Sequence, residues 1–201
     1  MNSSTKRLPK TTDNIQHFVL WVVVTAWMWA LGPAIWVIVG EGGSSIGVYI
    51  ETGLFLFGGI FIGLGQWLIF RHLGISGWWI AVTALGWTLG WFESIALIFL
   101  LGGGDFGMLG PIWLAIRLPI VGIIPGVTLG GLQSFTLRDD MRIRWILATS
   151  IGWAIGLPLS FVLSNLLPSL GNWGQAGFGT CISVGVATGI VLLQWKAHPP
   201  A

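Results

Sequence analysis

Long apolar stretches separated by short polar segments make up most of the chain. The apolar stretches cover residues 18–39, 46–70, 78–101, 107–137, 145–167 and 175–195. Each reaches the length of about 20 residues with which an α-helix crosses a bilayer. We therefore expect six transmembrane helices, with Pro119 and Pro125 interrupting the fourth and with turns and loops in the polar segments.

One twelve-residue pattern occurs three times, in the first, third and fifth of these stretches. It is W-x3-T-[AS]-x2-W-x-[LI]-G, in residues 21–32, 79–90 and 145–156. At about 100° per helical residue, its two tryptophans, threonine and final glycine fall within about 80° of one another and share one face. These residues are Trp21, Thr25, Trp29 and Gly32, then Trp79, Thr83, Trp87 and Gly90, then Trp145, Thr149, Trp153 and Gly156.

A face of indoles, a hydroxyl and a glycine differs from a surface that meets only lipid, because lipid requires no more than apolar bulk. The glycine lets a second helix approach closely, and the indole N–H and hydroxyl groups then find partners across the contact. We interpret this face as a helix-packing surface. The alternative is that the three faces together line one shared pocket.

The second, fourth and sixth stretches carry another pattern, in which two glycines four residues apart precede a glutamine. The set comprises Gly59, Gly63 and Gln66, then Gly126, Gly130 and Gln133, and in a looser form Gly185, Gly189 and Gln194. The glycine spacing permits close helix contact, and an amide near the membrane edge can hydrogen-bond across it. We interpret the glutamines as interhelical hydrogen bonders, with a head-group, pigment or solute site as the alternative.

Together these patterns predict an all-α membrane protein built from three tandem helix hairpins. The repeats are residues 18–72, 77–138 and 143–196 of one transmembrane domain, 17–196, with polar tails at 1–16 and 197–201. Because each repeat has two helices, all three enter the membrane with the same orientation. Such units bury their special faces against one another, so we expect a pseudo-threefold bundle, with a less regular bundle as the alternative.

Composition supports insertion into a membrane, and the charges set the orientation. The chain is 54% hydrophobic and only 8% charged, whereas soluble domains carry roughly 25% charged residues. One side of the predicted membrane carries the basic residues of the N-terminal tail, of position 71 and of 138–144, together with Lys196. The other side carries Glu41, Glu51 and Asp105. By the positive-inside rule both termini are cytoplasmic. The net charge of +2 belongs to these loops and does not indicate nucleic-acid binding.

Glu93 and Arg117 are the only ionisable residues well inside the predicted spans. Each lies roughly 10–15 Å from the loop that joins the third and fourth helices, at about 1.5 Å per residue. They stand on consecutive antiparallel helices, and we expect them to meet because an isolated charge inside a membrane is costly. One interpretation is a buried ion pair that fastens the two helices, and the other is a polar binding or proton-relay site.

The sequence contains no nucleophile–base pair and no set of metal ligands, so we do not expect an enzyme. The first function we consider is a non-catalytic membrane module that packs with, or helps assemble, a larger membrane complex. The second is a small-solute carrier or substrate-capture subunit with its polar site at Glu93 and Arg117. The third is a pigment- or lipid-binding accessory subunit, whose cofactor the sequence does not identify. The expected partners are the lipid bilayer and either another membrane protein or further copies of the chain.

Overall fold

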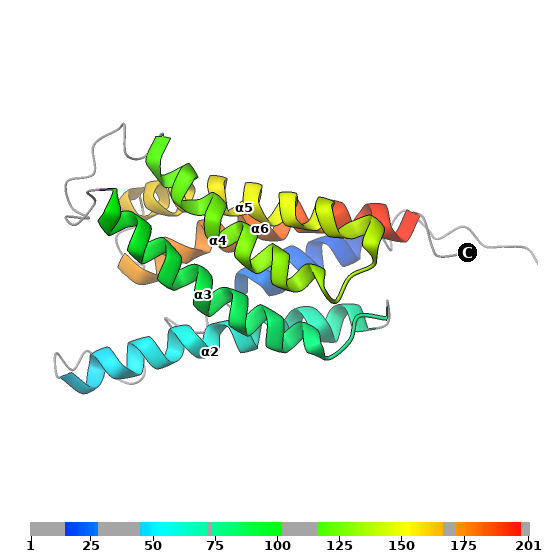
Figure 1. The fold of residues 1–201 in the computed structure, drawn as a ribbon, viewed down its shortest axis with the longest axis horizontal. Helices are drawn as coiled ribbons and strands as arrows, with labels where there is room; N and C mark the ends of the chain where they lie inside the picture. The colour runs from blue at the N-terminus through cyan, green and yellow to red at the C-terminus, as the bar shows by residue number, and fades with distance from the viewer. Residues whose placement is uncertain (1–14, 28–44, 72–73, 102–115, 167–171, 198–201) are drawn as a thin grey trace, which may run out of the picture.

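The computed structural model describes residues 15–27, 45–71, 74–101, 116–166 and 172–197, and all regular elements in these ranges are helices. The helices follow one another with short connections where the connection is described (Figure 1). In chain order they are a first helix, Ile15–Trp27, then α2 (Ser45–Phe70), α3 (Trp78–Leu100), α4 (Leu118–Ser134), α5 (Asp139–Leu166) and α6 (Asn172–Ala197). The expected all-helical class is confirmed for this part of the chain.

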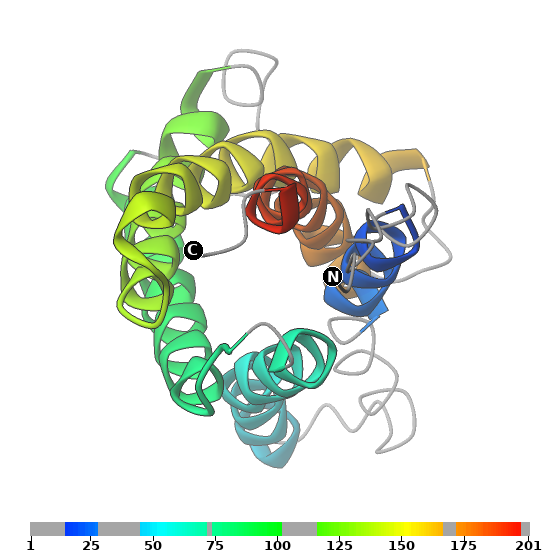
Figure 2. The ribbon, with the colours of Figure 1, turned by 90° about the vertical axis from the view of Figure 1, so that its right-hand side faces the viewer.

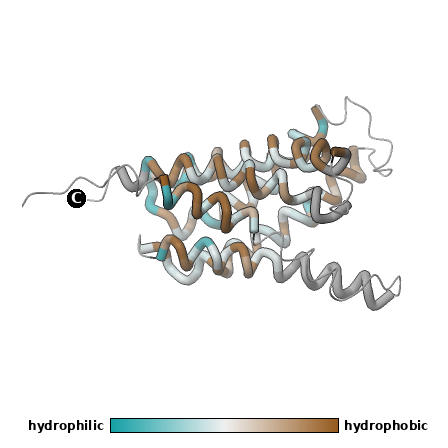
Figure 3. Tube along the Cα trace, turned by 180° about the vertical axis from the view of Figure 1, so that it is seen from behind, coloured by the Kyte–Doolittle hydropathy of each residue, from teal (hydrophilic) through white to brown (hydrophobic). Residues whose placement is uncertain are grey.

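Three helical segments of the described residues are long and apolar enough to cross a membrane. They are Trp78–Leu100, Asp139–Leu163 and Gly177–Gln194, and shorter apolar helices cover Ile15–Trp27, Gly58–Phe70 and Leu118–Ser134. Hydrophobic residues alternate with residues of intermediate hydropathy along the coloured parts of the helices, and most of the hydrophilic ones lie at the end that carries the α4–α5 turn (Figure 3). Large apolar side chains such as Phe92, Ile155 and Leu166 are exposed on the outside. These features are those of a membrane protein, because lipid is the solvent that suits such a surface.

Seen along the bundle, the helices surround a common centre (Figure 2). Consecutive helices pack against one another from α2 to α6. The first helix closes the ring, since its Thr25 accepts a hydrogen bond from Gln66 of α2 and its Trp21 donates one to Thr188 of α6. Every helix therefore contacts two neighbours, and side chains from all of them reach the centre.

Close helix contacts in this ring depend on glycines that face a neighbouring backbone. A Cβ added to Gly126 of α4 would lie 2.5 Å from Ser150 Cα of α5, and one added to Gly152 of α5 would lie 2.6 Å from Val184 Cα of α6. Real side chains do not tolerate such distances, so only glycine permits the observed spacing.

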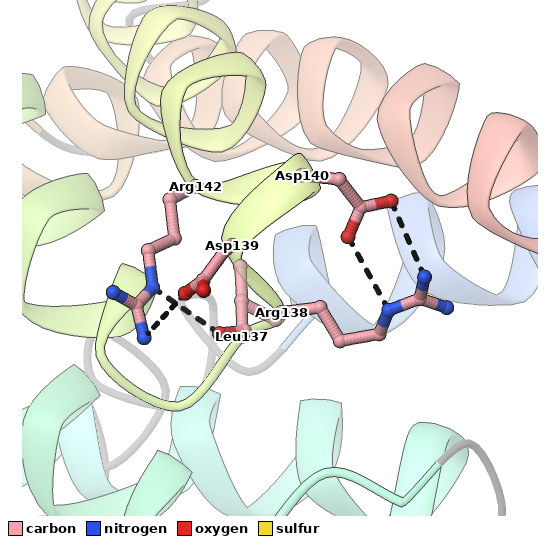
Figure 4. A network of polar contacts seen from close by, with 5 residues as sticks. All are labelled: Leu137, Arg138, Asp139, Asp140 and Arg142. Carbon is pink, nitrogen blue, oxygen red and sulfur yellow. Dashed lines mark hydrogen bonds and ion pairs between the residues drawn. The ribbon is translucent and has the colours of Figure 1, made fainter. Parts of the chain in front are cut away.

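The charged segment before the fifth helix differs from its prediction. We expected residues 138–144 to form a turn, but α5 begins at Asp139 and includes most of this segment. Two aspartates in the first turn favour a helix start, because carboxylates stabilise the positive end of the helix dipole. Arg138 pairs with Asp140 at 3.3 Å and Arg142 with Asp139 at 3.1 Å, while Arg142 Nε also donates to the carbonyl of Leu137 (Figure 4). These ion pairs thus join neighbouring residues of the short α4–α5 connection.

The prolines of α4 also behave differently from the expected interruption. Pro119 lies in the first turn of the helix, where its missing N–H costs nothing. Pro125 lies inside the helix, which continues on both sides of it. Its ring packs where Gly90 of α3 leaves room, since a Cβ on Gly90 would lie 2.9 Å from Pro125 Cβ.

Candidate functional site

Three tryptophans from three different helices fill the centre of the bundle. Trp21, Trp79 and Trp145 are each about 1% exposed. Their ring centroids are 5.4 Å apart for Trp79 and Trp145, 5.9 Å for Trp21 and Trp145, and 6.5 Å for Trp21 and Trp79, all with edge-on geometry. Phe70 adds a fourth edge contact to Trp21 at 4.8 Å. Edge-to-face contact is the favourable arrangement for aromatic pairs, so the three indoles form a packed plug.

Each indole of this tryptophan plug donates its N–H to a buried side chain of an even-numbered helix. Trp79 Nε1 donates to Gln66 Oε1 at 3.1 Å, and Trp145 Nε1 donates to Gln133 Oε1 at 2.9 Å. Trp21 Nε1 donates to the hydroxyl of Thr188 at 2.9 Å. The plug is therefore satisfied in its hydrogen bonds as well as tightly packed.

The two glutamine amides also donate, and this makes each of them a bridge between three helices. Gln66 Nε2 donates to the Thr25 hydroxyl at 3.2 Å, and Gln133 Nε2 donates to the Thr83 hydroxyl at 3.0 Å. Gln133 on α4 thus ties Thr83 of α3 to Trp145 of α5. Because the oxygen accepts and the nitrogen donates in both cases, the orientation of each amide is fixed.

The third glutamine singled out in the sequence lies elsewhere. Gln194 is exposed, and its Oε1 accepts a hydrogen bond from Arg144 Nη1 at 3.3 Å. The residue that meets Trp21 is Thr188, which sequence reasoning missed. A usable signal exists, because Thr188 follows Gly185 by the three residues that separate Gln66 from Gly63. Thr149 bonds only within its own helix, donating to the Trp145 carbonyl at 2.9 Å.

The glycines of the two patterns lie at helix contacts. A Cβ added at these glycines would meet a residue of a neighbouring helix. The pairs are Gly59 with Ala84, Gly63 with Ile80, Gly90 with Pro125, Gly126 with Ser150, Gly130 with Ile146 and Gly156 with Thr180. Each of these glycines faces a residue of the helix that comes next along the chain. Trp29 and Gly32, which belong to the first copy of the pattern, lie outside the described residues.

A second tryptophan layer, next to the plug, borders a small cavity. Trp87 and Trp153 face each other with centroids 5.6 Å apart. Both line a cavity of about 20 Å³, which is enough for about one water molecule. Its wall also contains the apolar side chains Ile62, Leu129, Cys181 and Val184 and the polar side chains Thr25, Gln66, Thr83, Gln133, Thr180 and Thr188. Of the described residues that line this wall, none is charged.

The indole N–H groups of Trp87 and Trp153 are buried and have no hydrogen-bond partner among the residues that the structure describes. A buried donor without an acceptor costs about 1–3 kcal/mol. These two indoles therefore contrast with the three of the plug, whose N–H groups are all bonded.

The structure gives Glu93 and Arg117 different partners, so the pairing expected from the sequence is not observed. The Thr128 hydroxyl of α4 donates to Glu93 Oε1 at 2.9 Å, and Arg117 Nη1 donates to the backbone carbonyl of Leu101 at 2.8 Å. The two side chains do not meet because they lie at different heights along the axis of the bundle. Glu93 lies beside Thr128, about three helical turns from Arg117, which caps the start of α4 and is exposed. Glu93 Oε2 is buried and has no partner within the described ranges.

Comparison with protein-family models, with curated proteins and with solved structures finds no match to this chain. Its function has to be argued from the tryptophan plug, the cavity and the distribution of charge.

Proposed function

We propose that the chain is a six-span membrane protein made of three hairpin repeats about a pseudo-threefold axis. In support, the plug takes one tryptophan from each copy of the twelve-residue pattern, and these three residues contact one another. Further support comes from corresponding glycine contacts. Gly63 faces Ile80, Gly130 faces Ile146 and Gly185 faces Val22, and in each case the second residue directly follows a plug tryptophan.

The same proposal assigns Thr188 to the position of Gln66 and Gln133. All three accept the N–H of a plug tryptophan, and all three stand three residues after a glycine that packs on the neighbouring helix. In this alignment Gly185 corresponds to Gly63 and Gly130. The glycine pair Gly185 and Gly189 therefore lies one helical turn later than the glycine pairs of the other two repeats.

We also propose that the end carrying the basic residues is cytoplasmic, with both chain termini on that side. The α2–α3 turn, the α4–α5 turn and the end of α6 lie at one end of the bundle (Figure 1). Arg71, Arg138, Arg142 and Arg144 belong to these segments, whereas Arg117 precedes α4 at the other end. An excess of arginine on one side is what the positive-inside rule requires.

For the function we propose a non-catalytic integral membrane module that packs with, or helps assemble, a larger membrane complex. The observation that carries the proposal is the filled centre of the bundle. A cavity of about 20 Å³ is far smaller than the roughly 300–1,000 Å³ of small-molecule sites. Stability and shape, and not the holding of an organic substrate, are what a hydrogen-bonded tryptophan plug provides.

A small-solute carrier or capture subunit is the second candidate, because Glu93 keeps a buried oxygen without a partner. Unpaired ionisable groups inside membranes are functional hypotheses by default. Two observations favour the packing module over it. Arg117 lies away from Glu93, and Glu93 is absent from the wall of the central cavity. A pigment- or lipid-binding accessory subunit has no corresponding observation among the described residues.

The test is to extract the protein gently from its own membrane and to measure the native mass of the particle, its absorption spectrum and its small-molecule content. We expect a stoichiometric protein partner. A matched sample extracted in a harsh detergent, which strips partners from the protein, provides the baseline mass. A bare chain that carries an organic molecule in fixed proportion, lost on Glu93→Gln, would instead establish the carrier candidate.

A further inference from the structure

Two indoles whose N–H groups have no partner among the described residues line the central cavity, one from α3 and one from α5. Trp87 and Trp153 are 5% and 3% exposed, and neither indole N–H has an acceptor in the described part of the chain. Their rings are in contact at 5.6 Å, and both line the same cavity.

Three acceptor side chains of the cavity wall receive the N–H groups of other tryptophans. The carboxamide oxygens of Gln66 and Gln133 receive the N–H groups of Trp79 and Trp145. The Thr188 hydroxyl receives that of Trp21 and itself donates to the Val184 carbonyl at 2.6 Å. None of these three side chains accepts the N–H of Trp87 or Trp153.

Size and charge narrow the class of ligand. The cavity has room for about one water molecule, which excludes organic solutes. A cation would find no carboxylate in the wall, and its hydration would not be replaced. A small hydrogen-bond acceptor fits the volume of the cavity and needs no carboxylate in its wall. Because no cationic side chain among the described residues lines the wall, a neutral oxygen is the first expectation, and a halide ion is the second source of the same hydrogen-bond acceptor that the test distinguishes.

We infer that the central cavity binds one small hydrogen-bond acceptor, a water molecule or a halide ion in its place, held between the indole N–H groups of Trp87 and Trp153. The ligand replaces the acceptor that the protein itself does not provide. Buried polar groups are satisfied in this way by internal water in other proteins. The site does not depend on the proposed partner complex.

The test uses the whole chain in lipid nanodiscs, with the tryptophan indole nitrogens labelled with ¹⁵N. Trp87→Phe and Trp153→Phe each remove one resonance and so assign the two signals. Magnetisation transfer from water to each indole proton is then measured in chloride buffer and again after chloride is replaced by bromide or gluconate. Trp79 is the internal control, because its N–H is bonded to Gln66 and it lies outside the cavity wall.

A bound water gives transfer from water to the Trp87 and Trp153 protons and none to Trp79, with no effect of the anion. A bound halide gives no such transfer, but both resonances shift when chloride is replaced. Either result supports the site. Two signals that show neither transfer nor a shift would mean that the cavity is empty and the donors unpaired, and the proposal would be wrong.

A second variant keeps the test independent of the tryptophan substitutions. Val184→Ile adds one methylene group to the cavity wall and should displace the ligand. We expect loss of the water transfer, or of the halide-dependent shift, at both indoles. A signal unchanged in Val184→Ile would place the acceptor outside the cavity and would overturn the assignment.

Discussion

At the scale of residues, the bundle is organised by the hydrogen bonds of buried indoles. An indole N–H in an apolar interior requires an acceptor, and the acceptor must come from another helix if it is also to fasten the fold. Gln66 and Gln133 do this while donating to Thr25 and Thr83. Removing one such amide therefore orphans an indole on one neighbouring helix and a hydroxyl on the other.

Replacing Gln133 by Leu should lower the free energy of unfolding by about 1–3 kcal/mol, because Trp145 Nε1 loses its acceptor in a buried site. The matched control is Gln194→Leu, which removes an exposed amide whose contact to Arg144 is 3.3 Å long. That variant should change stability by no more than about 0.5 kcal/mol. Denaturant titration of the two purified variants in the same detergent measures the difference. Equal losses in both would argue against the bridging role.

Sequence reasoning predicted many of these residues but not their connections. The shared helical faces singled out Trp79, Thr83 and Gln133 before any contact was known, since periodicity assigns residues to a face. It could not assign Thr188, because a hydroxyl carries a weaker signal than an amide and the neighbouring Gly189 suggested another alignment. Nor could it place Glu93 and Arg117 correctly, since the level of a residue along a helix depends on where that helix starts.

At the scale of helices, glycine positions decide how near two axes come. Gly126 of α4 faces the backbone of Ser150, whereas Gly131 on the same helix has no atom within 4 Å of an added Cβ. Substitutions at the two positions therefore distinguish the effect of close helix contact from the general effect of replacing a glycine in a helix.

Gly126→Ala should destabilise the protein by about 1–3 kcal/mol, because its Cβ forces α4 and α5 apart in a packed interior. Gly131→Ala should be neutral or slightly stabilising, since alanine is the better helix former by up to about 1 kcal/mol. Thermal unfolding of both variants in one lipid system provides the comparison. Similar melting temperatures for the two would contradict the close α4–α5 contact.

The bounds of the helices show where the apolar pattern alone predicts the ends of a helix correctly and where it does not. The third helix was expected at 78–101 and is Trp78–Leu100, because apolar residues fill it from end to end. The fifth was expected at 145 and begins at Asp139, since the rule that equates charge with a turn ignores charges that stabilise a helix start. Polar segments at membrane edges can therefore belong to helices that extend beyond the bilayer.

At the scale of the whole molecule, the tryptophan plug and the cavity exist only if the first and last helices close the ring. Trp21 completes the tryptophan plug only if the first helix packs against α6, and Thr188 is its acceptor there. A cavity of one-water size also requires a closed ring, because an open one would admit lipid or water to the centre. Closure within one chain is thus the central claim, and a non-catalytic packing module depends on it.

The most direct measurement is a disulfide between the two ends of the ring, formed in native membranes. A Cβ on Gly185 would lie 3.4 Å from Thr25 Cβ, close to the spacing of about 3.5–4.5 Å found in disulfides. Thr25→Cys with Gly185→Cys is therefore tested in a Cys181→Ala background. Val23→Cys with Gly185→Cys is the control, because Val23 is exposed on the outer face.

We expect mild oxidation to link Thr25→Cys to Gly185→Cys within one chain, giving a monomer that migrates faster on a non-reducing gel, and to leave the Val23 pair unlinked. Links formed only between two chains, or equal linking of both pairs, would show that the ring does not close in this way, and the plug, the cavity and the proposed module would lose their basis.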